Sequence, residues 1–222
     1  ANYSAGAMPT LPQSRAFDGS AFSPVTGKQW EAGAKFQPSS EHWLGSIAIF
    51  EIERSNALTR DPAHPSYSIQ TGEQRSRGIE LEWSGKLAPG WHLTAQGTWL
   101  DTEIVKDNRY RPGNRLPYSS KFSASAWIRH NFRAGDTASW VIAGGIVHQG
   151  ERYADFANTV LIPSFTRLDA GITYRAPRWS TTLSIENLAD KRYYASGVEN
   201  RPAVIYPGAP RTLNLRMNFD LN

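Results

Sequence analysis

Apolar and polar residues alternate along most of this chain, which is the period of β-strands and not of amphipathic helices. The alternation is strictest in residues 211–222, where single polar residues separate Leu213, Leu215 and Met217. The same period predicts eight further strands, at residues 27–37, 41–54, 72–87, 90–105, 121–132, 138–150, 167–175 and 179–186. Residues 1–4 suggest the end of a tenth strand. We therefore expect an all-β, antiparallel protein.

The links between these strands alternate in length. Short links at 38–40, 88–89, 133–137 and 176–177 separate longer ones at 1–26, 55–71, 106–120, 151–163 and 190–210. Outer-membrane β-barrels sort their links in this way, with short periplasmic turns and long extracellular loops. Both ends of a soluble β-sandwich meet the same solvent, so a sandwich has no reason to do so. The pattern favours a transmembrane barrel, in which residues 1–26 form an extracellular loop after the remnant of a preceding strand.

Aromatic residues mark the ends of the predicted apolar stripes. Trp91 and Trp99 share a face and lie eight residues apart. At about 3.3 Å per residue they are about 26 Å apart along the strand. A tilt of about 40° reduces this to a height of about 20 Å, near the apolar band of about 25 Å in such barrels. We expect two membrane girdles that contain Trp91, Trp99, Phe122, Phe132, Trp179 and Phe219. The alternative is that these rings form the core of a soluble β protein.

Composition narrows the class of protein further. Aromatic residues make up 12% of the 222 residues, with eight Trp, and the formal charge is only +4. The basic residues are scattered, so we expect no nucleic-acid partner. Without cysteine, disulfides, thiolate zinc sites and cysteine nucleophiles are excluded. The longest apolar run, residues 141–147, is too short for a spanning helix, and no signal peptide opens the chain. We expect a mature product or a fragment.

Candidate catalytic and metal-binding residues are few. The five histidines are dispersed without metal-ligand spacing, so we predict no metal site and no cofactor. Glu80 and Glu82 share a strand face, but such a pair more often lines a wet lumen beside Lys or Arg than catalyses a reaction. No nucleophile-elbow motif surrounds a serine. Composition alone leaves a Ser-His-Asp triad open, but we expect no enzyme.

Five segments in consecutive order resemble motifs of TonB-dependent outer-membrane receptors, the ferric-siderophore subgroup in particular. They are Thr26–Phe36 (TGKQWEAGAKF), Ser76–Glu82 (SRGIELE), Gly113–Pro117 (GNRLP), Ile185–Tyr194 (IENLADKRYY) and Gly208–Thr212 (GAPRT). The resemblance covers nearly all of the chain.

This resemblance implies a fold, a location and partners. The family's barrel has 22 strands around an N-terminal plug, so residues 1–222 correspond to a partial barrel of about nine or ten C-terminal strands, without the plug. It implies the outer membrane of a Gram-negative bacterium, contact with its lipid, and uptake of a ferric siderophore. The TonB energy-transducing complex would act through the missing plug. In the family the last residue is usually aromatic, whereas here Phe219 is followed by three more residues.

Aromatic and Arg side chains in the predicted extracellular loops are our candidates for ligand binding. Aromatic faces and guanidinium groups suit an anionic iron chelate. The candidates are Tyr67, Arg109, Tyr110, Arg111, Tyr118, Arg152, Tyr153, Phe156 and Tyr206. For Tyr193 and Tyr194 we favour a structural role at the base of their loop.

Three rival interpretations remain open at this stage. The chain could form a passive, porin-like small barrel, but Pro9, Pro12 and Pro24 argue against a full closing strand in residues 1–26. A soluble β-sandwich that binds carbohydrate would also be rich in Trp. A lipase-type barrel enzyme is the third.

Overall fold

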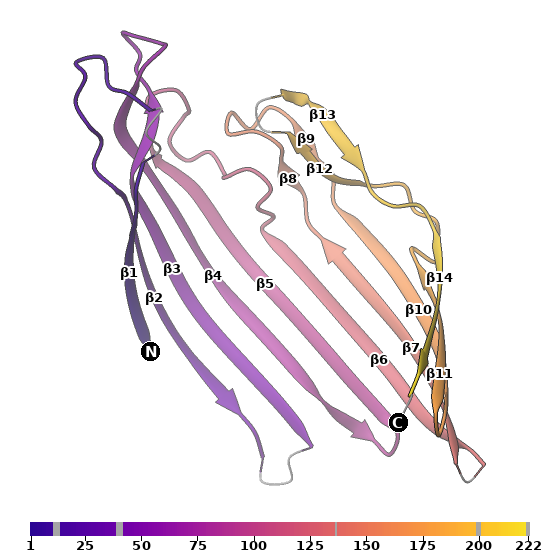
Figure 1. The fold of residues 1–222 in the computed structure, drawn as a ribbon. Helices are drawn as coiled ribbons and strands as arrows, with labels where there is room; N and C mark the ends of the chain where they lie inside the picture. The colour runs from indigo at the N-terminus through magenta and orange to yellow at the C-terminus, as the bar shows by residue number, and fades with distance from the viewer. Residues whose placement is uncertain (11–13, 39–41, 136, 199–200, 221–222) are drawn as a thin grey trace.

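The computed structural model of this chain is built around one curved, antiparallel sheet of ten strands (Figure 1). It describes residues 1–10, 14–38, 42–135, 137–198 and 201–220. The strand order is β1-β2-β3-β4-β5-β6-β7-β10-β11-β14, so every strand pairs with its predecessor in this sheet. The predicted all-β, antiparallel class is confirmed. The part of the chain described here contains no helix long and apolar enough to cross a membrane.

The strands of the main sheet follow the predicted order. Their bounds are β1 Asn2–Met8, β2 Val25–Phe36, β3 Trp43–Arg60, β4 Ser68–Ala88, β5 Trp91–Lys106, β6 Phe122–Ala134, β7 Ala138–Gln149, β10 Phe165–Ala176, β11 Trp179–Glu186 and β14 Thr212–Phe219. The predicted strand positions 221–222 and most of the predicted 38–40 turn lie outside the described residues. Two small hairpins complete the structure: β8 Arg152–Tyr153 with β9 Leu161–Ile162, and β12 Tyr194–Val198 with β13 Arg201–Pro207.

The predicted long loop at residues 55–71 is wrong. β3 continues to Arg60 and β4 begins at Ser68, so only residues 61–67 link them. A bulge interrupts the register between Arg54 and Ala57, where Asn56 has a φ of 59°. A bulge adds an unpaired residue and shifts which face the following side chains occupy. The alternation therefore fades there, although backbone pairing continues.

The links fall into two sets at opposite ends of the sheet. Residues 89–90, 135, 137 and 177–178 lie at one end, which we call the short-turn end, where β2 also ends and β3 begins. The other end, the long-link end, carries residues 9–10, 14–24, 61–67 and 107–121 and the two small hairpins. Figure 1 shows both hairpins at this end.

One face of the sheet is apolar and open. Leu213, Leu215 and Phe219 of β14 are 64%, 68% and 64% exposed. Few apolar side chains are buried in the described residues: Ala16, Val25, Ala57, Ile104, Val141, Ala154 and Ile162. A β-sandwich needs two sheets packed face to face, and within the described ranges no second sheet covers this apolar face. The sandwich interpretation therefore does not fit the structure.

Aromatic rings line both ends of the apolar face. At the short-turn end Trp91 stacks on His130 with ring centroids 4.4 Å apart, and His130 stacks on Phe132 at 5.7 Å. Further along the same end, Tyr174 packs 5.2 Å from Trp179, which pairs in register with Phe219. Towards the long-link end, Trp99 pairs in register with Phe122. The six predicted girdle residues thus occupy two rows, each at one end of the apolar face.

Candidate ligand-binding site

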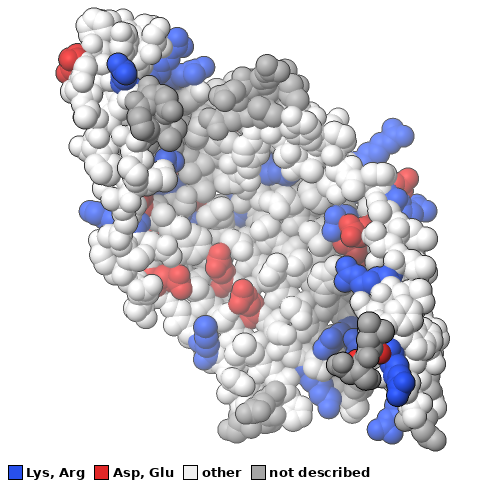
Figure 2. Space-filling view, in the orientation of Figure 1, with Lys and Arg blue, Asp and Glu red and all other residues white. Residues whose placement is uncertain are grey.

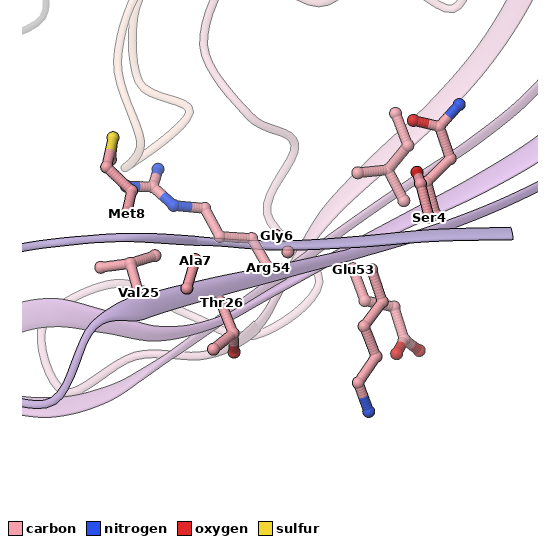
Figure 3. A pocket seen from close by; sticks show the side chains of 12 residues that line it. Ser4, Gly6, Ala7, Met8, Val25, Thr26, Glu53 and Arg54 are labelled. Atoms are coloured by element: carbon pink, nitrogen blue, oxygen red, sulfur yellow. The ribbon is translucent and has the colours of Figure 1, made fainter.

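A pocket of about 520 Å³ opens at the long-link end of the sheet. Strand β3, the start of the 9–24 link, the 107–110 loop and Phe156 enclose it. Figure 3 shows a neighbouring pocket of about 420 Å³ between β1, β2 and β3. Met8 and Arg54, which line both pockets, extend to the same side of the strands there, whereas Thr26 and Glu53 extend to the other side. The side that carries Arg54 is the polar face, opposite the apolar face, because side chains alternate along a strand.

Two aromatic rings and a guanidinium group meet in this pocket. The ring centroids of Tyr110 and Phe156 lie 5.3 Å apart, and the Arg109 guanidinium carbon lies 5.1 Å from the centre of the Tyr110 ring. The Asp107 carboxylate accepts hydrogen bonds from the backbone N–H groups of Arg109 at 2.7 Å and Tyr110 at 3.0 Å. Such a turn fixes the chain directly after β5 ends. It therefore sets where the Tyr110 ring stands.

The loop that carries Phe156 is fastened to the loop after β5. The Asn114 side-chain amide donates to the carbonyl oxygen of Phe156 at 2.9 Å. Asn158 accepts a hydrogen bond from the Arg115 backbone N–H at 2.8 Å and donates to the Arg115 carbonyl at 2.9 Å. These contacts join segments about forty residues apart in sequence. The Tyr110–Phe156 pair depends on them.

Asp155 holds the 151–162 loop in shape. Its carboxylate accepts hydrogen bonds from the backbone N–H groups of Thr159 and Val160 and from the Thr159 hydroxyl, at 2.8–3.2 Å. Burial alone would raise the pKa of Asp155, but these hydrogen bonds stabilise the carboxylate and lower its pKa below the ordinary 3.8. The group therefore stays ionised and keeps Phe156 in place.

Arg152 has a different environment from Arg109. Its side chain is buried, with the residue only 4% exposed. It donates to the carbonyl oxygens of Tyr194 at 3.0 Å and Ala195 at 2.7 Å, and burial lowers the pKa of its guanidinium group. These contacts tie the β8–β9 hairpin to the β12–β13 hairpin. Arg152 does not line the pocket.

The structure brings together three of the nine predicted ligand residues, Arg109, Tyr110 and Phe156. Tyr67 packs instead against Phe17 and His64. Tyr153 lies under the Arg115 guanidinium group, 4.9 Å from it. Tyr206 pairs with Ser196 in β12–β13. Arg111 and Tyr118 are exposed outside this pocket.

Sequence reasoning did not select three charged residues of the pocket, Arg54, Arg60 and Asp107. Arg54 was the last residue of a predicted strand, and Arg60 lay in the predicted loop that is in fact strand. An Asp directly after a strand, as at 107, was a usable turn signal. Tyr193, for which a structural role was favoured, stacks on Phe165 at 4.2 Å between ring centroids.

Comparison with known proteins identifies the class. The family model described as "TonB dependent receptor-like, beta-barrel" matches residues 1–188. The chain belongs to this family of outer-membrane receptor barrels. The family consists of receptors and transporters and not of enzymes.

Individual relatives agree with this assignment. The chain is 32% identical over 222 residues to the Ferrioxamine B receptor of Salmonella typhimurium, covering 94% of this chain and 31% of that protein. It is 36% identical over 203 residues to the Ferrichrome receptor FcuA of Yersinia enterocolitica, covering 88% of this chain and 26% of that protein. The chain thus spans less than a third of the length of these relatives.

A solved structure shows the same fold. The siderophore receptor PiuA from Acinetobacter baumannii matches with a TM-score of 0.82 at 25% identity, over 98% of this chain and 33% of that chain. The ferric preacinetobactin receptor BauA from the same organism matches with a TM-score of 0.81 at 26% identity, over 97% and 33%. The predicted partial receptor barrel is confirmed, and neither a soluble sandwich nor a lipase-type barrel is supported.

Proposed function

We propose that these ten strands are part of an outer-membrane receptor that takes up a ferric siderophore. The pocket at the long-link end carries the proposal, because two aromatic rings and three arginines, Arg54, Arg60 and Arg109, line it. Guanidinium groups suit anionic ligands, and aromatic faces suit flat or cationic parts of a chelate. The proteins that it resembles include receptors for ferrioxamine B and ferrichrome.

The orientation follows from the same proposal. The two aromatic rows would lie at the membrane interfaces, with Trp91, Phe132, Trp179 and Phe219 on the periplasmic side and Trp99 and Phe122 on the outer side. The exposed apolar face between them would contact lipid. The long-link end, including residues 9–24, would then face the cell exterior and receive the ligand. Residues 1–222 would act within a longer receptor, whose plug would transmit the pull of the TonB complex.

The test is equilibrium binding of ⁵⁵Fe-loaded ferrioxamine B and ferrichrome to outer membranes of the cell that makes the receptor. Tyr110→Ala removes one ring of the pair and the surface beneath Arg109. Removal of the Tyr110 ring takes away a ring-pair contact and a cation–π contact, each worth about 0.5–1.5 kcal/mol. We therefore expect the chelates to bind about tenfold more weakly.

Tyr67→Ala is the matched control, because Tyr67 is also a loop tyrosine but packs on Phe17 and His64 outside the pocket. We expect unchanged binding for this variant. If neither chelate binds to the unaltered receptor, or if Tyr110→Ala binds them as well as the control does, the pocket is not the ligand site.

A further inference from the structure

Positive charge exceeds negative charge in the ligand pocket at the long-link end. Arg54 and Arg60 of β3 and Arg109 of the loop after β5 line it, and we call them the pocket arginines. All three are exposed. Figure 2 shows Lys and Arg side chains at the upper left, where the 61–67 link lies in Figure 1. Within the described ranges, Asp107 is the single carboxylate among the residues that line the pocket.

No acidic side chain of the described residues pairs with these cations. None of the ion pairs that these residues form includes a pocket arginine. The Asp107 carboxylate instead accepts hydrogen bonds from two backbone N–H groups of its own loop. Asp61, which lines a neighbouring cavity of about 260 Å³, accepts from the backbone N–H groups of Ala63 at 2.8 Å and His64 at 3.1 Å. Both carboxylates thus shape turns and leave the arginines unmatched.

The pocket arginines keep most of their N–H groups available. Arg60 donates one hydrogen bond, from its Nε to the carbonyl oxygen of Pro65 at 2.8 Å. The Arg109 guanidinium group lies over the Tyr110 ring and, like that of Arg54, makes no hydrogen bond with the described residues. A guanidinium group presents its donors in a planar fork that matches paired oxygens. These donors therefore suit a ligand with adjacent, negatively charged oxygens.

The same pocket presents aromatic surface. The Tyr110 and Phe156 rings lie with their centroids 5.3 Å apart and their planes inclined by 34°. A ring that a ligand supplies can pack on this pair in an offset or edge-to-face arrangement. The guanidinium group of Arg109, 5.1 Å from the centre of the Tyr110 ring, can then contact both the ring and the charge of the ligand.

Iron chelates differ in both respects. A catecholate group is an aromatic ring with two negatively charged oxygens on neighbouring carbons, so three such groups around Fe³⁺ leave a net negative charge. A hydroxamate group carries one negative charge and no aromatic ring, so three of them only balance Fe³⁺. Ferrichrome is a neutral complex of this kind, and ferrioxamine B carries an additional ammonium group. Citrate supplies negative charge without rings. Of these chelates, the catecholate matches both features of the pocket.

We propose that the ligand pocket selects a ferric catecholate over hydroxamate chelates. The pocket arginines contact its oxygens, and the Tyr110–Phe156 pair packs on its rings. This inference rests on the proposed function and deepens it by naming the class of chelate. It sets the chain apart from the relatives at 32% and 36% identity, whose names specify ferrioxamine B and ferrichrome.

Equilibrium binding to outer membranes of the cell that makes the receptor tests the class, with membranes that lack the receptor as background. The probes are the ⁵⁵Fe complexes of a tripodal tris-catecholamide and of citrate, together with ferrichrome and ferrioxamine B. Charge-assisted hydrogen bonds are about twice as strong as neutral ones, so we expect the tris-catecholamide to bind about tenfold more tightly than ferrichrome. Ferrioxamine B should bind most weakly. If ferrichrome or the citrate complex binds as tightly as the tris-catecholamide, the inference is overturned.

Arg54→Gln isolates the contribution of charge. We expect the tris-catecholamide to bind this variant about tenfold more weakly and ferrichrome to bind it within about twofold of the unaltered receptor. Arg54→Lys keeps the charge and should bind the tris-catecholamide more tightly than Arg54→Gln does. Arg192→Gln, at an exposed loop position outside the pocket, is the matched control and should bind both chelates normally. Equal losses for both chelates in Arg54→Gln would overturn the inference.

These measurements separate failure of the inference from failure of the proposed function. Ferrichrome or ferrioxamine B bound more tightly than the tris-catecholamide would overturn the class of chelate and still support siderophore uptake. Absence of binding by every chelate would overturn the proposed function, and the inference with it.

Discussion

Two arginines in neighbouring loops of this protein, Arg109 and Arg152, look alike in sequence and differ in the structure. Arg109 is exposed beside the Tyr110 ring and lines an open pocket. Arg152 is 4% exposed and donates hydrogen bonds to two backbone carbonyls of another hairpin. The comparison separates an open region, where side chains are available to a ligand, from an anchored region, where similar side chains hold the loops together.

The anchored region is centred on Asn187, which is 1% exposed at the end of β11. Its side-chain amide donates to the carbonyls of Lys191 at 2.9 Å and Ala209 at 3.0 Å, and its side-chain oxygen accepts from the Lys191 N–H at 2.8 Å. Its own N–H donates to Asp169, which pairs with Arg167. One side chain thus ties both ends of the 187–211 link together.

The largest effect should come from Asn187→Ala. The change removes three hydrogen bonds of about 1 kcal/mol each. It also places Ala at a φ of 55°, which costs about 1 kcal/mol more. Local opening should become about 3–4 kcal/mol easier, so trypsin should cut at Lys191 and Arg192 at least a hundredfold faster where opening is fast relative to cleavage. The cleavage rate in outer membranes measures this.

Asn214→Ala, at an exposed position of β14, is the matched control and should leave the cleavage rate unchanged. Equal rates for the two variants would show that Asn187 does not anchor the link. Siderophore binding to Asn187→Ala sharpens the comparison further, because Asn187 does not line the pocket.

A smaller effect is expected from Arg152→Met. Met keeps most of the buried apolar volume, but the carbonyls of Tyr194 and Ala195 lose their donors. Part of that loss is offset because a buried charge is removed as well. We expect local opening of the link to become about 1–2 kcal/mol easier, which corresponds to roughly tenfold faster tryptic cleavage at Lys191 and Arg192. Arg111→Met, at an exposed loop position, should leave the rate unaltered; if both variants behave alike, Arg152 is not an anchor.

The smallest effect concerns pH and Asp155. Its pKa in the folded protein is below the ordinary 3.8 that it has when the loop is open. The carboxylate therefore contributes stability at pH values above 3.8, and this stability is lost as the pH falls through the lowered pKa. Hydrogen exchange of residues 151–162, corrected for the intrinsic rate, should show less protection at pH 3 than at pH 5.

Asp155→Asn should lower the hydrogen-exchange protection of residues 151–162 at pH 5. It should also abolish most of the pH dependence of this protection, because Asn cannot ionise. Strand β7 provides the internal reference, since its own sequence contains no acidic residue. A pH dependence that persists unchanged in Asp155→Asn would assign it to another group.

Much of the fold could be predicted because the period of two is a local property. Consecutive side chains of a strand point to opposite faces of the sheet. Where one face meets an apolar surrounding and the other a polar one, as in β14, apolar and polar residues must therefore alternate. The prediction failed between residues 55 and 71, where the bulge at Asn56 breaks the register. Backbone pairing continues there without the side-chain pattern that signals it.

The sequence by itself determined the strand order, the two sets of links, the aromatic rows and the family, because these depend on local alternation, link length and short motifs. Only the tertiary structure decided which loop residues meet. Tyr110 reaches Phe156 because Asn114 and Asn158 join two loops that are far apart in the chain. Burial likewise made Arg152 an anchor and left Arg109 open, since exposure depends on long-range packing that residue type does not encode.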